Sequence, residues 1–355
     1  MGITKNMIKL DPSQAVFVGL DVHKTTWSIS VIHQSHLIFR ATIPSDWEGL
    51  VKLLKRYKNH PIYSVYEAGF SGFHLHRRLC EAGIKNIITP PNKIPVLSGN
   101  RVKTDKIDSL KLATFLSQGL LSAIYIPCEK QSAMRQLLRT REQLKYQRTA
   151  TINQLKGLLI QYNIQVKTPG LTQKSLRQLQ HEKLPEEIQM VIQSYGTLWS
   201  TLSTQMRELR KRAELLASES IYQETYQRLQ SAPGVGSLIA AAFALEIGDW
   251  NRFSNEKQIS AFFGLTPAEY SSGEHTHRGR ITGQGNPWLR GLLIQAAWRM
   301  IRIDFDMLKI YERLSQQTGS KKKAIVGIAR KLICRLYAME KSKQEYRRSA
   351  PRAAA

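Results

Sequence analysis

The first ninety residues combine two hydrophobic periods. Within residues 16–43, short runs rich in β-branched and aromatic residues, VFVGLDV, TTWSISVI and HLIFRATI, are joined by brief polar turns. This pattern predicts three adjacent strands, arranged as a meander. From Trp47 the period changes, and WEGLVKLLKRY, IYSVYEAG, FHLHRRLCEAG and IKNIITP predict helix, strand, helix and strand in turn. The N-terminal part is therefore expected to be a mixed α/β domain.

The next helix is predicted in TDKIDSLKLATFLSQG, beginning near Thr104. Threonine is a good helix cap, and Asp105 and Asp108 in the first turn are favoured by the helix dipole. A well-capped helix is the simplest explanation of these residues.

Long helical periodicity follows from Glu129 to Asn163 and again from Leu184 to Ser220. These stretches predict two antiparallel coiled-coil arms, with Pro169 and Gly170 marking the tip between them. A connector of this kind can space two domains or pair two protomers.

Small apolar residues and glycines dominate from Tyr222 to about Met339, which predicts a second, mainly α domain. The charged and then featureless tail is expected to be disordered. The predicted organisation is a catalytic domain at 12–128, a helical arm at 129–221, a second domain at 222–340 and a tail at 341–355.

The charge balance of 52 Lys+Arg against 27 Asp+Glu gives +25, which points first to nucleic acid. No apolar run approaches the roughly 18–20 residues of a membrane span, and the N-terminus lacks a secretory signal. Cys80, Cys128 and Cys334 lie far apart, without zinc-site spacing, and suggest reduced thiols. We therefore expect a cytoplasmic protein without a membrane partner.

Four acids are candidate metal ligands. Asp21 ends the run VFVGLD and Glu67 ends IYSVYE, so both lie at strand ends, whereas Asp105 and Asp108 lie about 5–6 Å apart at Cβ on one helical face. Convergence of four carboxylates requires a divalent cation to offset their repulsion, and such cations serve phosphate chemistry. Taken singly, each acid has an ordinary structural explanation, and His23 and Lys24 are expected to be turn residues.

The second domain offers two candidate nucleic-acid contacts. The turn PGVG at 233–236 fits a helix-hairpin-helix-like element, in which Gly234 and Gly236 would expose backbone N–H groups to a phosphate. A loop rich in serine and glycine is expected between Pro267 and Pro287, where Arg278 and Arg280 can clamp phosphate. From composition alone, a flexible basic loop explains the second feature as well.

A family resemblance adds to these readings. VGLDVHK, VYEAGFSG and KTDKIDSLKLA resemble the DEDD site of RuvC-like nucleases, which have a ribonuclease H fold. Together with PGVG, GLTPAEYSSG and GRITGQGNPWLR, they resemble bacterial insertion-sequence transposases that act as bridge-RNA-guided serine recombinases. The resemblance spans about Val16 to Met339.

The resemblance implies a site and partners. The family's four acids fall on Asp21, Glu67, Asp105 and Asp108, which would bind Mg²⁺ or Mn²⁺, and its nucleophile falls on Ser272. It also implies donor and target DNA, a structured guide RNA and a homo-oligomer, a dimer or tetramer, in which one protomer's carboxylates face another's serine. The serine would form a phosphoserine link to DNA.

Two alternatives remain open from the sequence. The first is a metal-dependent RuvC-like nuclease of the junction-resolvase type, in which water attacks and Ser272 is only a loop residue. The second is a non-catalytic nucleic-acid-binding scaffold. A covalent protein–DNA adduct separates the transposase from the nuclease, and metal-dependent cleavage separates both enzymes from the scaffold.

Overall fold

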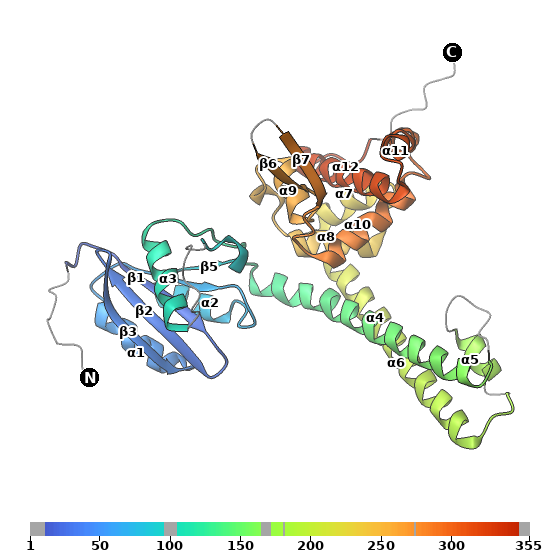
Figure 1. Ribbon diagram of the computed structural model, residues 1–355, viewed down its shortest axis with the longest axis horizontal. Coiled ribbons are helices and arrows are strands. Elements are labelled where there is room, and N and C mark those ends of the chain that lie inside the picture. The colour runs from blue at the N-terminus through green and yellow to red at the C-terminus, as the bar shows by residue number, and fades with distance from the viewer. Residues whose placement is uncertain (1–10, 96–104, 165–171, 180–181, 273–274, 348–355) are drawn as a thin grey trace, which may run out of the picture. The chain divides into compact units, whose positions relative to one another are not determined.

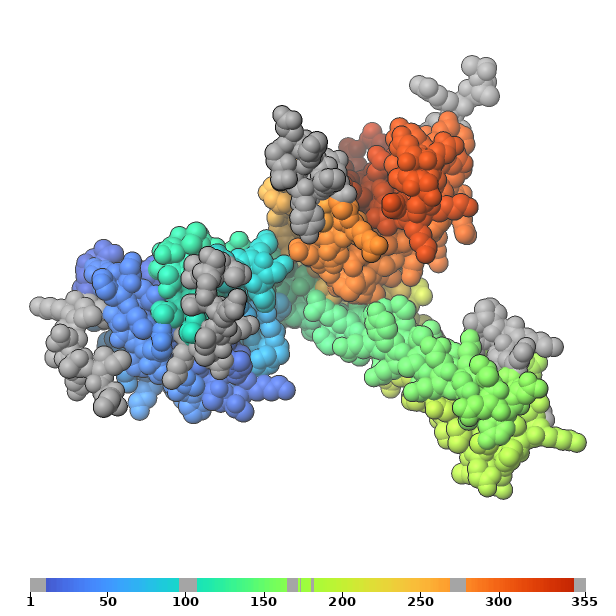
Figure 2. Space-filling view, in the orientation of Figure 1, coloured from blue at the N-terminus to red at the C-terminus, as the bar shows by residue number. Residues whose placement is uncertain are grey.

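The computed structural model describes residues 11–95, 105–164, 172–179, 182–272 and 275–347. The chain divides into two compact units, 1–126 and 127–355. Figure 1 shows the helices and strands of each unit, and Figure 2 shows the same units in space-filling form.

The first unit is built on a five-stranded mixed sheet of order β3-β2-β1-β4-β5. Its strands are β1 (Val16–Val22), β2 (Thr26–His33), β3 (His36–Pro44), β4 (Ile62–Glu67) and β5 (Lys85–Thr89). The first three pair antiparallel, which confirms the predicted meander, while β4 runs parallel to both β1 and β5. The helices of this unit are α1 (Trp47–Leu54), α2 (His74–Glu81) and α3 (Asp105–Ser117), with single 3₁₀ turns at Lys55–Tyr57 and Pro91–Lys93.

The two faces of this sheet are covered by different helices. Val18 and Leu20 of β1 share a hydrophobic core with Leu50 of α1 and Leu79 of α2. Residues of a strand alternate between faces, so Gly19 belongs to the other face, where α3 lies. The predicted helix around Asp105 is therefore present, and Thr104, its expected cap, lies outside the described residues.

Gly19 permits an unusually close approach between α3 and β1. A Cβ at this position would lie 2.0 Å from the Ser109 carbonyl oxygen and 2.5 Å from the Ala113 amide nitrogen. Both atoms belong to the helix backbone and cannot move aside as a flexible side chain would. Beside this contact the buried hydroxyls of Ser30 and Ser109 lie 2.9 Å apart and form a hydrogen bond.

The second unit begins with a long antiparallel helical hairpin. The predicted arms are present as α4 (Glu129–Gln161) and α6 (Glu186–Glu219). A short helix that the periodicity did not indicate, α5 (Gln173–Leu179), packs at the far end of the hairpin through Leu179, beside Leu155 and Ile192. Pro169 and Gly170, the expected tip residues, lie outside the described residues.

The remaining elements form a largely helical bundle around one hydrophobic core. They are α7 (Gln223–Ser231), α8 (Ser237–Ile247), α9 (Glu256–Phe262), α10 (Pro287–Met300), α11 (Phe305–Thr318) and α12 (Lys321–Ser342), with a 3₁₀ turn at Trp250–Arg252. One expectation was wrong, because β6 (Pro267–Ser272) and β7 (His275–Ile281) form an antiparallel ribbon where the sequence suggested a loop. The high content of serine and glycine in this segment is typical of loops, and it led to the expectation of a loop.

The base of the hairpin is fixed to this bundle by polar contacts. Gln131 and Arg135 of α4 donate to the Leu245 carbonyl at 2.9 Å, and Arg135 also reaches the Glu246 carbonyl at 2.8 Å. Arg139 binds both carboxylate oxygens of buried Glu246 at 2.7 and 2.8 Å. These hydrogen bonds raise the pKa of Arg139 above its ordinary value. The hydrogen bonds from Gln131 and Arg135 satisfy carbonyls at the C-terminus of α8 that the helix itself leaves unpaired.

Residues 341–347, expected to belong to a disordered tail, are ordered, because α12 continues to Ser342 and the chain after it packs on the bundle. Tyr346 packs beside the core, its hydroxyl donates to Asp304, and its backbone amide donates to Ser231 at 2.8 Å. Residues 348–355 lie outside the described part of the chain. Among the described helices, none is both long enough and apolar enough to cross a lipid bilayer.

The Gly19 contact gives a first prediction. Gly19→Ala should destabilise the N-terminal unit by about 1–3 kcal/mol, because the added methyl meets helix backbone and forces α3 away from the sheet. Urea unfolding followed by circular dichroism measures the change. Gly157→Ala is the matched control: no atom lies within 4 Å of a Cβ at that position inside α4, so stability should rise slightly. Equal midpoints for Gly19→Ala and the parent would contradict the packing argument.

Candidate functional site

A row of polar residues crosses the sheet of the first unit on the face covered by α3. Asp21 pairs with Ser28 of β2, and Ser28 pairs with Thr42 of β3. The parallel register between β1 and β4 pairs Gly19 with Val65 and Leu20 with Tyr66, so one further step brings Asp21 level with Glu67. Glu67 in turn pairs with Thr89 of β5. The polar row is thus Thr42, Ser28, Asp21, Glu67 and Thr89.

These five positions share a face because paired residues of neighbouring strands point to the same side. Asp21 is two residues from Gly19, whose missing side chain faces α3, so the polar row lies on the α3 side. Phe17 and Tyr63, another pair on this face, stack with ring centroids 5.6 Å apart. The two predicted strand-end acids therefore occupy adjacent parallel strands at the same level.

The helix acids precede the point where α3 touches the sheet. Ser109, which lies over Gly19, directly follows Asp108, and Asp105 occupies the helical position one turn before Ser109. The Asp108 carboxylate is partly exposed and lies 3.9 Å from the Lys111 ammonium. The Asp105 side chain lies outside the described part of the structure.

Metal binding has partial support from this geometry. Among the side chains that the structure describes, no three His, Cys, Asp or Glu residues are grouped closely enough to hold a metal ion. The four-carboxylate cluster therefore stays a prediction. The row does contain a polar atom suited to a polar ligand: the Thr89 hydroxyl is fully buried and has no hydrogen-bond partner among the described residues. Carboxylate and hydroxyl oxygens are the hard donors that Mg²⁺ and Mn²⁺ prefer.

Neighbouring side chains support the two strand-end acids. The His23 Nε2 lies 3.2 Å from the Asp21 carboxylate, so His23, expected to be an ordinary turn residue, contacts a candidate ligand. Beside Glu67, the buried Tyr66 hydroxyl donates to the Gly72 carbonyl at 3.0 Å and accepts from the His76 amide at 3.2 Å. Burial raises the pKa of Tyr66 to about 12, so it remains a neutral hydroxyl that fixes the chain after Glu67.

The candidate nucleophile lies in the β6–β7 ribbon. Ser272 is the last residue of β6 and pairs with His275, while Ser271 pairs with Thr276. Consecutive strand positions belong to opposite faces of a ribbon, so the two serine positions are not equivalent. Arg280 of β7 is exposed, whereas the side chains of Ser272 and Arg278 lie outside the described part of the structure.

The PGVG turn joins α7 to α8 as a helix–turn–helix unit. Gly234 has φ +85°, and a Cβ there would lie 2.3 Å from the Ala296 carbonyl of α10, so this glycine is required for packing. Gly236 precedes α8, where the Ser237 hydroxyl donates to the Glu214 carboxylate at 2.8 Å. A carboxylate therefore already lies beside this helix N-terminus, and phosphate binding by Gly234 and Gly236 stays a prediction.

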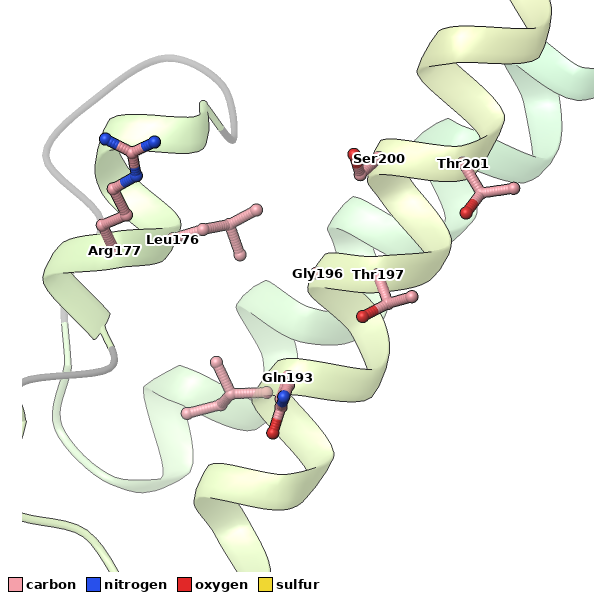
Figure 3. Close-up of a pocket in the computed structure, with 8 residues that line it drawn as sticks. Leu176, Arg177, Gln193, Gly196, Thr197, Ser200 and Thr201 are labelled. Atoms are coloured by element: carbon pink, nitrogen blue, oxygen red, sulfur yellow. The ribbon is translucent and has the colours of Figure 1, made fainter.

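The far end of the hairpin carries a cavity without reactive groups. A pocket of about 420 Å³ lies between α5 and α6, lined by Leu176, Arg177, Ile192, Gln193, Gly196, Thr197, Ser200 and Thr201. Figure 3 shows Leu176 directed from α5 toward α6, with the hydroxyls of Ser200 and Thr201 on α6. Hydroxyl and amide groups without an acid or a base give no catalytic set, so we place no chemistry here.

Sequence reasoning missed the residues that position the site. Gly19 and Ser30 are unremarkable in the sequence, and the Ser30–Ser109 hydrogen bond joins residues far apart in the chain. The only available signal was a glycine two residues before Asp21, on the same strand face.

Comparison with known proteins identifies the family. Residues 18–164 match a transposase family model, DEDD_Tnp_IS110, and residues 226–312 match the model described as Transposase IS116/IS110/IS902 family. A putative transposase, y4qE, from Sinorhizobium fredii (strain NBRC 101917 / NGR234) is 30% identical across 79% of this chain and 71% of its own length. The transposase for insertion sequence element IS1111A from Coxiella burnetii is 28% identical across 80% of this chain and 79% of its own.

A more distant relative has a different named role. The pilin gene-inverting protein of Moraxella lacunata is 22% identical across 91% of this chain and 95% of its own length.

The chain is a DNA transposase and belongs to the IS116/IS110/IS902 transposase family. Its DEDD transposase domain implies a divalent metal ion.

The polar row gives the second prediction. Glu67→Gln and Asp108→Asn each keep the size of the side chain but remove a charge from the expected cation site, so metal-dependent DNA cleavage should fall more than about 100-fold. Cleavage of a labelled target at several Mg²⁺ concentrations measures this. Glu48→Gln is the control. Glu48 is an exposed acid of α1, on the opposite face of the sheet, so this variant should retain activity. Full cleavage by either site variant, or by the parent protein in chelator, would refute the carboxylate assignment.

Proposed function

We propose that this transposase cuts and rejoins DNA through a phosphoserine intermediate on Ser272, under the direction of a bound guide RNA. The observation that carries the catalytic part is the polar row, which brings Asp21 and Glu67 to one level of adjacent parallel strands beneath α3. In this proposal the first unit is a RuvC-like catalytic domain.

Asp21, Glu67, Asp105 and Asp108 would hold the divalent cations, Mg²⁺ or Mn²⁺. When bound there, such cations polarise a scissile phosphate and stabilise the charge that develops on it. His23 would hold the Asp21 carboxylate in place, and the Thr89 hydroxyl would bind a water or ligand oxygen beside Glu67.

The serine step balances without an external energy source. The Ser272 Oγ attacks phosphorus and loses its proton, the bond from phosphorus to a DNA oxygen breaks, and that oxygen takes up a proton. The phosphodiester is replaced by a phosphoserine ester, so a DNA hydroxyl can attack it in reverse and rejoin the strand. Arg278 and Arg280 of the same ribbon would bind the flanking phosphate.

A composite site in a dimer or tetramer would bring Ser272 of one protomer to the carboxylates of another. The guide RNA would select target and donor sequences by base pairing, which leaves the protein to bind backbone. The net charge of +25 suits such a partner. The PGVG turn, with Gly234 and Gly236, would contribute backbone contacts to the nucleic acid.

Hydrolysis is the second candidate mechanism. It is favoured by the polar row, because Asp21 and Glu67 lie at one level of adjacent strands and hydrolysis needs only the carboxylate half of the site. In a RuvC-like nuclease, water bound at the carboxylate site would attack the phosphate, and the ribbon would only hold DNA. The two mechanisms predict different products.

The third prediction concerns the covalent adduct. Ser272→Ala should abolish recombination and the protein–DNA adduct while nucleic-acid binding persists, because the change removes one oxygen and no charge. The assay is incubation with guide, target DNA and Mg²⁺, followed by denaturing electrophoresis and peptide mapping. Ser271→Ala is the matched control, since it makes the same change at the neighbouring strand position, and it should retain activity. An adduct on Ser271, or efficient cleavage with no adduct, would favour the alternatives.

The fourth prediction concerns the guide. The purified protein should retain one structured RNA species after a high-salt wash, because nonspecific phosphate contacts weaken steeply with salt. Sequencing the retained RNA provides the measurement. A random mixture of cellular transcripts would argue against a dedicated guide while leaving the Ser272 assignment untouched.

A further inference from the structure

The corner between α10 and α11 carries exposed aromatic and basic side chains in one short segment. We call this surface the α10–α11 corner; its residues are Trp298, Arg299, Arg302, Ile303, Phe305 and Lys309. The exposed fractions of Trp298, Ile303 and Phe305 are 37%, 53% and 60%. Exposed apolar side chains that are grouped and rimmed by polar residues are typical of binding surfaces.

The charge of this corner is positive. None of Arg299, Arg302 and Lys309 forms an ion pair with a carboxylate among the described residues. Asp304, which lies in the same segment, is buried, accepts from the Met307 amide at 3.0 Å and binds the Tyr346 hydroxyl. Its charge is therefore directed inward, and half-buried Asp306 is the one other acid between residues 298 and 309 that offsets the three exposed cations.

Another segment of the chain exposes apolar side chains without any charged residue. Met190 and Leu198 of α6 are 62% and 47% exposed, yet the segment from Ile188 to Met206 contains no charged residue. A helical segment without charged residues suits a protein contact better than it suits a polyanion. The α10–α11 corner differs from this segment because its exposed apolar side chains lie on a segment that also carries three exposed cations.

Two aromatic rings of the corner make contacts with neighbouring side chains. The Lys309 ammonium lies 4.4 Å from the centroid of the Phe305 ring, and Phe305 remains exposed. Trp298 makes an edge-to-face contact with Tyr311 of α11, with centroids 5.7 Å apart. A nucleotide stacked on Phe305 would thus have a cation near its phosphate.

Arg299 connects the corner to the PGVG turn. Its Nη1 lies 4.0 Å from the position that a Cβ of Gly236 would occupy, so the guanidinium lies beside the start of α8.

We propose that the α10–α11 corner binds unpaired nucleotides, with bases stacked on Phe305 and Trp298 and phosphates held by Arg299, Arg302 and Lys309. A duplex hides the faces of its bases, so this surface selects single strands over paired ones. Unpaired RNA and unpaired DNA share this chemistry. The inference deepens the proposed function, because guided recombination exposes single strands of both kinds.

The test is equilibrium binding of labelled 12-nucleotide oligouridine, 12-nucleotide oligothymidine and a 12-base-pair blunt DNA duplex to the full chain, read by fluorescence anisotropy. Phe305→Ala should weaken binding of the two single strands about 5- to 150-fold, the usual effect of losing one stacking partner, and leave duplex binding within twofold. Arg302→Ala should weaken both and lower their salt dependence. The single strand that binds more tightly identifies the RNA or the DNA source.

Tyr146→Ala is the matched control. Tyr146 is a 65% exposed aromatic residue of α4 with the Lys145 ammonium 5.8 Å from its ring centroid, so it copies the local chemistry elsewhere in the same unit. It should not change single-strand binding. Circular dichroism confirms that each variant is folded, and Phe305→Tyr, which keeps a stacking ring, should restore affinity if Phe305→Ala loses it.

Two outcomes would overturn the proposal. One is unchanged single-strand affinity in Phe305→Ala, and the other is an equal loss for duplex and single strand, which would indicate a protein contact or a folding role at the corner. Neither outcome depends on the phosphoserine. If no Ser272 adduct forms but Phe305→Ala still weakens single-strand binding, only the proposed mechanism is refuted. If the adduct forms but Phe305→Ala leaves single-strand binding unchanged, only the proposed role of the α10–α11 corner is refuted.

Discussion

The candidate active site depends on the contact between the backbone of α3 and Gly19 of β1. With the Ser109 carbonyl 2.0 Å from where a Cβ would be, the helix can lie this close to the sheet only over glycine. Because Asp21 is the next residue of β1 on that face, the same contact sets the distance between the strand-end acids and the helix that carries Asp105 and Asp108. A metal site tolerates errors of only a few tenths of an ångström in its ligands, so a rigid backbone contact is a suitable support.

In the second unit, charged hydrogen bonds fix the position of a helix, whereas close backbone packing does so in the first unit. Glu246 is buried at the end of α8, and its carboxylate is neutralised by Arg139, while Arg135 binds two carbonyls of the same helix end. Removing Arg139 would leave the buried Glu246 carboxylate with fewer compensating partners, which is destabilising because water cannot fully solvate it there. The hairpin base is thereby held to the bundle by directional contacts, which fix the direction of α4 where it leaves the core.

Periodicity predicted the regular elements well, and local chemistry predicted the irregular ones poorly. The meander, the helix carrying Asp108 and the two long arms follow from alternation and helical spacing. The β6–β7 ribbon could not be predicted in this way, because serine and glycine around Ser272 are typical of loops. Pairing between two strands also depends on more than the local sequence. Tyr346 was hidden for a similar reason: its stabilisation comes from Asp304 and Ser231, which are distant in the sequence. The strand-end acids could be predicted, but their common level could not, because it depends on the register between β1 and β4.

The distribution of charge links the two halves of the chain. A protein with a net charge of +25 attracts phosphate almost anywhere on its surface, so attraction alone cannot place a scissile bond. The acids of the polar row repel the same phosphate unless cations are bound beside them. A DNA strand would therefore be stable at this row only in a metal-loaded form, whereas basic surfaces of the second unit would need no metal to attract nucleic acid. Separation of binding from cutting in this way would keep the bound strand intact until the site is complete.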